Sequence, residues 1–300
     1  MEKSEIIRIL EMVDAIVDEY DLDLPDGYKR RDSNEPNRAI KEYWEIEIAK
    51  IFRKRFRRQA VIIREYLENH PIGKAAGPGG ADIPIGDPET DEQLIKAFIG
   101  MMDDGFQISG ITASIELSFA QYNEEALNWV DQWVYELTDM VDATTGKRLE
   151  RELTNFIADE GYTIADVMNG LERSGLDRGR AEDIAVSEVT RTFGKSEYVV
   201  GQVAAAEYPD VRVVKTWFTN NDSMVCPICR PLNGRTILMD QEFLPEILHP
   251  PAHPKNCRCW MQTETDILEE MDLYNEGTPG GSQLPIPGIS DVPAAISGES

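Results

Sequence analysis

The chain has 300 residues and a formal net charge of −25, from 30 basic and 55 acidic residues, and such a surface repels nucleic acid unless a local basic patch overcomes the field. No charged-then-apolar signal opens the sequence and no apolar run approaches the roughly 20 residues of a membrane span, so we expect a protein made in a reducing cytoplasm. A hydrophobic content of 41% is enough for a core, and the length favours two domains or one domain with extensions.

Helical periodicity dominates the first two thirds of the chain. Apolar residues recur three or four positions apart with charged residues between them, which predicts amphipathic helices. Thr163 and Asp177 each stand directly before a periodic stretch, where a helix N-cap is expected. The predicted helices are Ser4–Tyr20, Arg38–Asn69, two between Thr90 and Asp142 with a break near Gly105–Gly110, Lys147–Ala158, Ile164–Arg173 and Arg178 to about Glu207.

The second predicted helix carries the dense basic run Arg53-Lys54-Arg55-Phe56-Arg57-Arg58 in its middle. Two interpretations stay open. In the first, the run is a solvated helix face that balances nearby acidic residues. In the second, Arg53, Arg55, Arg57 and Arg58 form a docking patch for an acidic partner surface or a phosphate.

Glycine and proline interrupt the chain between residues 71 and 90, where Gly77-Pro78-Gly79-Gly80 and three further prolines leave little regular structure. A phosphate-binding loop would need Lys and then Ser or Thr after the glycines, but Ala81-Asp82-Ile83 follows, so we exclude one. The sequence predicts an N-terminal helical region at 1–70, a linker at 71–90, a helical domain at 91–210, a β element at 211–265 and a disordered tail at 275–300.

The character of the chain changes after Pro209. Val211–Phe218 is rich in β-branched and aromatic residues and predicts a strand, and Arg235–Met239 predicts a second one after a tight turn at Asn233-Gly234. Cys257–Thr263 predicts a third short strand. We therefore expect a mainly α protein with a small, zinc-stabilised β-hairpin element near the C-terminus, an α+β arrangement.

All four cysteines of the chain lie between residues 226 and 259, together with two of its three histidines. A C-x-x-C pair turns two thiolates toward one ion, and a second Cys/His group about thirty residues later completes a closed tetrahedral zinc site. Its candidate ligands are Cys226, Cys229, His253, Cys257 and Cys259. We favour a site formed by Cys226, Cys229, His253 and one of Cys257 or Cys259. The alternatives are a four-cysteine site in which His253 contacts a ligand but not the ion, or no metal at all. Such an ion would be structural.

Two catalytic interpretations of this cluster compete with the structural one. A zinc deaminase needs a His-x-Glu motif upstream of its C-x-x-C pair, but the upstream histidine here stands in His70-Pro71-Ile72. A cysteine nucleophile with His249 or His253 as its base would leave three cysteines without a role. A zinc-dependent hydrolase or nucleic-acid-modifying enzyme is therefore the alternative, and we expect no catalytic residue.

Spaced residues between about Thr145 and Gln262 form a longer pattern that includes the cysteines. They are Ile184, Ala185, Glu188, Arg191, Lys215, Trp217, Asp222, Cys226, Cys229, Leu232, Gly234, Pro250, Pro251, His253, Pro254, Cys257, Arg258 and Cys259. In order and spacing the pattern resembles the head-morphogenesis domain of phage Mu F-type minor head proteins. Two features depart from that family: Ser187 stands where a threonine is usual, and the spacing from His253 to Cys257 is one residue longer.

The resemblance implies a non-enzymatic minor head protein of a tailed phage or prophage. Such a protein is made in the host bacterial cytoplasm and incorporated inside the capsid of the virion. The implied partners are the portal protein and other capsid or scaffold proteins, with no membrane and no specific nucleic-acid contact. The implied role is head morphogenesis, and DNA packaging or ejection is a further role that the family suggests.

Overall fold

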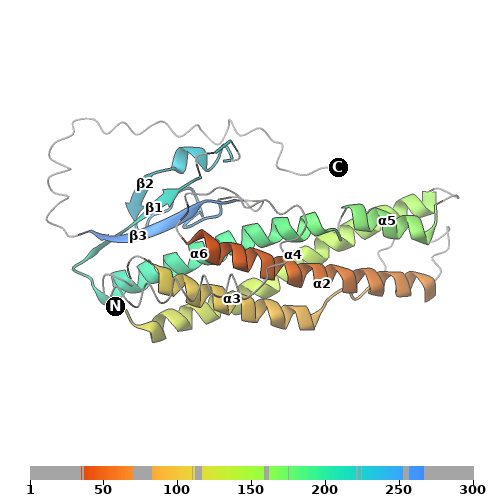
Figure 1. Cartoon of the computed structure of the whole chain (residues 1–300), viewed down its shortest axis with the longest axis horizontal. Helices are drawn as coiled ribbons and strands as arrows, with labels where there is room; N and C mark the ends of the chain where they lie inside the picture. Colours follow the sequence, from red (N-terminus) through yellow and green to blue (C-terminus); the bar gives the residue numbers. More distant parts are fainter. Residues whose placement is uncertain are drawn as a thin grey trace. The chain divides into compact units, whose positions relative to one another are not determined.

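The computed structural model describes residues 35, 37–69, 83–109, 111, 117–158, 162–174, 176–220, 222–223, 225–252 and 257–266. The predicted helix Ser4–Tyr20, the predicted tail 275–300 and His253 lie outside these residues, and the predicted domain boundaries stay a prediction. The elements in chain order are α2 (Arg38–Asn69), α3 (Pro88–Ile108), α4 (Phe119–Ala158), α5 (Ile164–Ser174), α6 (Arg178–Glu207), β1 (Arg212–Phe218), the short 3-10 helix η1 (Arg230–Leu232), β2 (Arg235–Leu238) and β3 (Trp260–Asp266) (Figure 1).

Polar side chains fix the starts of α5 and α6 as the sequence predicts. Thr163 and Asp166 exchange hydrogen bonds before α5: the backbone N–H of each donates to the side chain of the other. At the start of α6, Asp177 accepts a hydrogen bond of 2.7 Å from the Arg180 N–H. Both predicted caps are confirmed, and the mainly helical fold class with a small β element is confirmed with them.

The predicted separate helix Lys147–Ala158 is wrong, because α4 runs without a break from residue 119 to residue 158. The hydroxyls of Thr144 and Thr145 donate to the carbonyls four residues earlier, at 2.8 and 3.0 Å, and so leave the backbone hydrogen bonds of the helix in place. Gly146 costs a helix only about 1 kcal/mol relative to alanine. Packing of α4 against its neighbours overrides that local preference.

Helix α6 packs against α2, α3, α4 and β1 within the compact unit that ends at Thr265. The larger cluster of buried apolar side chains joins α2, α3, α4 and α6 to the sheet and includes three of the cysteines. A smaller cluster joins residues of α2 and α4 to α5. Among the described residues, no helix combines the length and the apolar character that a membrane crossing needs.

The three strands form one sheet in the order β2-β1-β3. Strands β1 and β2 are antiparallel, with Val214 opposite Leu238 and Trp217 opposite Arg235. The turn before β2 uses Gly234 at φ +76°, the left-handed conformation that the Asn-Gly pair predicts. The predicted third strand is present but begins later than expected, at Trp260, so Cys257 and Cys259 precede it.

Candidate metal centre

The C-x-x-C segment forms a tight turn between β1 and η1. The Cys226 carbonyl accepts a hydrogen bond from the Arg230 N–H at 3.0 Å, and Cys226 Sγ accepts one from the Cys229 N–H at 3.3 Å. A backbone N–H directed at sulfur stabilises the charged thiolate more than the neutral thiol. These two hydrogen bonds hold Cys226 and Cys229 in one short loop, the knuckle turn.

Cys229, Cys257 and Cys259 bring their sulfur atoms together in the protein interior. The three sulfur atoms lie within 4.8 Å of one another, and Cys229 Sγ is 3.9 Å from Cys257 Sγ. Tetrahedral zinc with Zn–S bonds of about 2.3 Å places its sulfur ligands about 3.8 Å apart. None of the four cysteines, all within the described residues, forms a disulfide. The donor set and its spacing fit a zinc ion.

The remaining predicted ligands are placed differently. Cys226 is half-buried and stands outside the compact group of three sulfur atoms. His253 lies outside the described residues. The structure thus brings together three of the five predicted ligands, and it leaves the choice of a fourth between Cys226 and His253.

The grouped thiols disfavour negative charge unless a cation lies among them. Hydrogen bonding to Cys257 and Cys259, followed by burial, raises the pKa of the Cys229 thiol far above its usual range. The hydrogen bond with Cys229 alone would lower the pKa of Cys259, but Cys257 and burial raise it overall. A divalent ion reverses this preference, because it binds thiolates and releases their protons.

The indole N–H of Trp217 is a buried donor beside this group. Trp217 is 0% exposed, and its Nε1 makes no hydrogen bond within the described residues. Trp217 acts to lower the pKa of Cys259, against the larger effects of Cys257 and burial. A thiolate is a stronger acceptor than a thiol, and metal-bound thiolates commonly receive such a donor. This unsatisfied N–H therefore fits a charged, metal-bound Cys259.

Two contacts connect the cysteine segments to each other and to α6. Arg258, between two of the cysteines, forms an ion pair of 2.8 Å with Asp222, which precedes the knuckle. The Thr190 hydroxyl on α6 donates to the Cys257 carbonyl at 2.6 Å. The cysteine group is thereby tied to the helix that packs against most of the fold.

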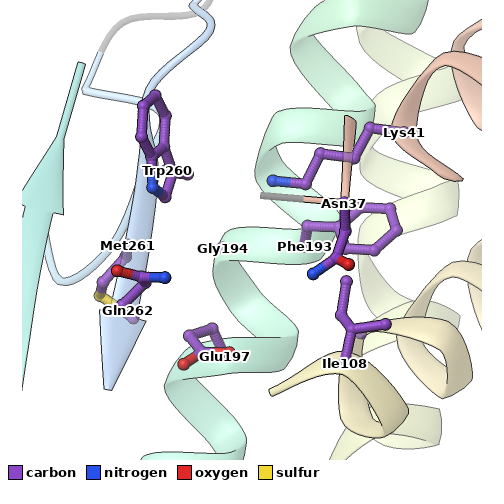
Figure 2. A pocket seen from close by; sticks show the side chains of 10 residues that line it. Asn37, Lys41, Ile108, Phe193, Gly194, Glu197, Trp260, Met261 and Gln262 are labelled. Carbon is purple, nitrogen blue, oxygen red and sulfur yellow. The ribbon is translucent and has the colours of Figure 1, made fainter. Parts of the chain in front are cut away.

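Glu197 of α6 anchors the strand that follows the cysteines. Its Oε1 accepts hydrogen bonds from the N–H and the hydroxyl of Thr263 at 2.7 and 2.6 Å. Figure 2 shows Glu197 extending from α6 toward Gln262 of β3, beside a cavity of about 60 Å³. Burial raises the pKa of this carboxyl, while the Thr263 hydrogen bonds act in the opposite direction.

Residues 131–262 match the family model described as Phage Mu protein F like protein. This segment, just under half of the chain, is similar to the phage Mu F-like family. The Mu F-like segment runs from the middle of α4 into β3 and contains all four cysteines. The resemblance drawn from the spaced motif is thereby confirmed. No curated protein and no solved structure matches the chain.

Within the Mu F-like segment, Glu188 and Arg191 of the motif meet Trp133 of α4. Trp133 Nε1 donates to Glu188 Oε2 at 2.7 Å, Arg191 Nε lies 3.3 Å from the same oxygen, and the Arg191 guanidinium lies 4.3 Å from the centre of the Trp133 ring. Burial raises the pKa of Glu188, and Arg191 opposes that shift. Glu188 is an ion-pair partner buried between α4 and α6. No sequence pattern indicated Trp133.

Lys215 of the motif lies buried under the loop that leads to residue 252. Its Nζ donates to the Leu248 carbonyl at 3.0 Å and lies 4.7 and 5.4 Å from the ring centres of Tyr198 and Phe243. Burial lowers the pKa of this ammonium to about 8. The cation–π contacts and the hydrogen bond hold the loop against β1 and α6.

Arg55 of the basic run is an interior residue, only 1% exposed. Its guanidinium donates to both carboxylate oxygens of Asp142, at 3.0 and 2.6 Å, to Asp91 at 2.5 Å and to the Thr90 hydroxyl at 3.0 Å. These contacts connect α2 to α3 and α4. Arg55 therefore offers no surface to a partner in this structure.

The other arginines of the run lie toward the solvent. Arg58 forms ion pairs with Asp87 and Glu89, at 3.0 and 2.5 Å. Arg57 is exposed, and Arg53 is half-buried beside it. Partial burial, followed by repulsion from nearby arginines, lowers the pKa of Arg53. The run thus divides into residues with intramolecular ion pairs and a smaller surface group.

Proposed function

We propose that this protein is a non-enzymatic structural component of a phage head and acts in head morphogenesis. The observation that carries the proposal is the match of residues 131–262 to Phage Mu protein F like proteins. The cysteine group supports it, because a set of buried sulfur ligands integrated into the main apolar cluster suits a closed architectural site. The protein is made in the host bacterial cytoplasm and enters the virion.

The proposal includes a structural zinc ion held by Cys229, Cys257 and Cys259, with Cys226 or His253 as the fourth ligand. Bound there, the ion would tie the knuckle turn to the start of β3. Two small segments far apart in the sequence would then be fixed to each other.

Metal analysis of the purified chain tests this part of the proposal. We expect one zinc per chain and loss of that zinc in Cys259→Ser. Comparing Cys226→Ser with His253→Ala identifies the fourth ligand, because only the variant of the true ligand loses zinc. A metal-free chain in which residues 222–259 stay as protected from hydrogen exchange in a strong chelator as in its absence would contradict a structural zinc.

The proposal also assigns a partner surface to Arg53 and Arg57 of α2 and the neighbouring Arg178 of α6. Burial is the first cause that lowers the pKa of Arg53, and Arg178 and Arg57 lower it further, while Glu182, which pairs with Arg178 at 2.6 Å, raises it. The three cations therefore act on one another's surroundings with one neighbouring carboxylate, on a chain with a net charge of −25. Such a local patch suits an acidic face of the portal protein or of another capsid protein. A role in DNA packaging or ejection would follow from a position next to the portal.

Incorporation into heads tests the role and the patch together. In a phage that encodes this protein, deletion of its gene should reduce the yield of normal heads, and mass spectrometry should detect the protein in purified wild-type heads. Arg53→Glu/Arg57→Glu should lower incorporation, whereas Lys96→Glu/Lys147→Glu, with the same charge change at exposed positions elsewhere, should not. Normal heads without the protein would refute the role. Equal incorporation of both variants would refute the patch.

A further inference from the structure

The cavity of about 60 Å³ beside Glu197 is lined by the start of α2, the end of α3, the middle of α6 and β3. Figure 2 shows five of its side chains, Asn37, Lys41, Glu197, Trp260 and Gln262, on segments far apart in the sequence. Four of these five end in a charged or an amide group. The cavity therefore suits a polar ligand, and the charges of its lining decide which kind.

Glu197 is a buried carboxylate that forms no ion pair with any residue the structure describes. It is 9% exposed, and its Oε1 accepts both Thr263 hydrogen bonds. Burial is the first cause that acts on its pKa, and it raises the pKa in spite of those hydrogen bonds. A buried carboxylate is costly unless an opposite charge reaches it. A cation in the cavity would supply that charge.

Lys41, which also lines the cavity, is engaged with other groups. Its Nζ forms an ion pair with Glu35 and lies 5.1 Å from the centre of the Phe193 ring. It acts on the pKa of Glu197 less than burial and the Thr263 hydrogen bonds do. Since Lys41 and Glu35 offset each other, the charge of Glu197 remains. The net charge of −25 on the whole chain adds to this preference for a cation.

The other side chains favour a guanidinium over an ammonium. The Trp260 indole is buried and stacks on Phe218 of β1 with 5.7 Å between ring centres, which makes it a fixed aromatic wall. The side-chain amides of Asn37 and Gln262 offer carbonyl oxygens as acceptors. A guanidinium directs five N–H donors from one plane and stacks on aromatic rings, whereas an ammonium is a compact point charge.

The size of the cavity indicates what carries this cation. Pockets that enclose small-molecule ligands measure roughly 300–1,000 Å³. A cavity of about 60 Å³ instead accommodates one end of a side chain. Asn37 is exposed while Glu197 is buried, so a side chain that enters past Asn37 reaches the carboxylate at its far end.

We propose that this cavity binds one arginine side chain of another head protein, with the guanidinium against Glu197 and its plane along Trp260. The source of the arginine rests on the proposed function, whereas the site is a property of this chain alone. Such a contact would fix a partner to α6 and β3, the two elements that hold the cysteine group.

Titration of the full chain with N-acetyl-arginine amide, followed by the NMR signal of the Trp260 indole N–H, tests the site. We expect saturable binding with a Kd in the millimolar range. N-acetyl-citrulline amide, which has the same shape without the charge, should bind at least ten-fold more weakly. Glu197→Gln should weaken binding of the arginine probe at least ten-fold and keeps an oxygen for Thr263. Glu264→Gln, with the same charge change at an exposed position of β3, should bind like the wild type.

A second variant leaves Glu197 in place. Ile108→Trp puts a large ring at the rim of the cavity and should abolish binding of the arginine probe. Equal binding of the two probes overturns the proposal, as does undiminished binding by Glu197→Gln or Ile108→Trp. Absence of saturable binding in the millimolar range also overturns it. Normal heads without this protein would refute the role in the head and leave the probe titration unchanged, so the two failures are distinguishable.

Discussion

Replacing Arg55 by alanine should destabilise the fold by about 3 kcal/mol, although the residue sits in a basic run that looks like a surface feature. The substitution removes the cation between Asp91 and Asp142 and leaves two carboxylates without their partner. Breaking a buried ion pair in this way costs about 3–5 kcal/mol. The lower value applies here, because the side chains of Asp91 and Asp142 remain 20% and 19% exposed and keep some hydration.

Urea denaturation followed by far-UV circular dichroism measures this loss, and Arg57→Ala is the matched control. Arg57 is exposed, so its removal should change the free energy of unfolding by less than about 0.5 kcal/mol. The thermal midpoint of Arg55→Ala should fall by roughly 6–12 °C for a folded unit of this size. Arg55→Met combined with Asp91→Asn and Asp142→Asn should recover part of the loss, because no uncompensated charge remains.

Equal free energies of unfolding for Arg55→Ala and Arg57→Ala would contradict a buried structural role for Arg55. A normally stable Arg55→Ala chain that is excluded from heads would return Arg55 to a partner-binding role. The comparison therefore separates the two interpretations of the basic run residue by residue.

Three further predictions concern the C-terminal element and its contact with α6, and a fourth concerns α4. Trp217→Phe should weaken zinc binding about ten-fold in a chelator competition, because it removes the N–H donor beside the sulfur group; unchanged affinity would contradict that role. Burial lowers the pKa of His249 to about 4. The stability contributed by its neutral ring is therefore complete above a pH of about 6.5 and is lost as the pH falls toward 4. In His249→Asn, the denaturation midpoint should depend less on pH within that window. Gly194→Ala should cost about 1–3 kcal/mol because its Cβ would stand 2.6 Å from the Pro250 carbonyl oxygen. Gly146→Ala, with open space around its Cβ, should stabilise α4 by up to about 1 kcal/mol.

Local signals were enough to predict most helices and strands from the sequence. The bounds of α2 agree with its apolar periodicity, the caps at Thr163 and Asp177 are in place, and Asn233-Gly234 forms the turn before β2. Each of these features depends on residues a few positions apart. The unbroken α4 was missed, because it is set by packing of distant helices and not by the Thr-Thr-Gly stretch itself.

The candidate site was predictable in part for the same reason. The spacing of the cysteines indicated a common cluster, and the structure brings Cys229, Cys257 and Cys259 together. The contact of Trp133 with Glu188 has no local signature, since the two residues come from different helices. Trp217 belongs to the motif, but its effect on Cys259 does not follow from the spacing of the two residues. The burial of Arg55 had no local signature either. Arg53, Arg57 and Arg58 are the same residue type in the same run, and they differ from Arg55 in the side of the helix on which they lie.

Helix α6 connects the motif residues in its own sequence to the cysteines far downstream by direct contacts. Successive turns of this helix contact different parts of the C-terminal element: Thr190 holds the Cys257 carbonyl, Gly194 admits the Pro250 carbonyl and Glu197 holds Thr263 of β3. Each contact needs a rigid helix, which packing against α2, α3 and α4 provides. Loss of a bound metal would therefore release the knuckle turn first, while α2–α6 stay packed. A metal-dependent unfolding transition confined to residues 222–259 is the expected signature of an architectural ion on a preformed helical support.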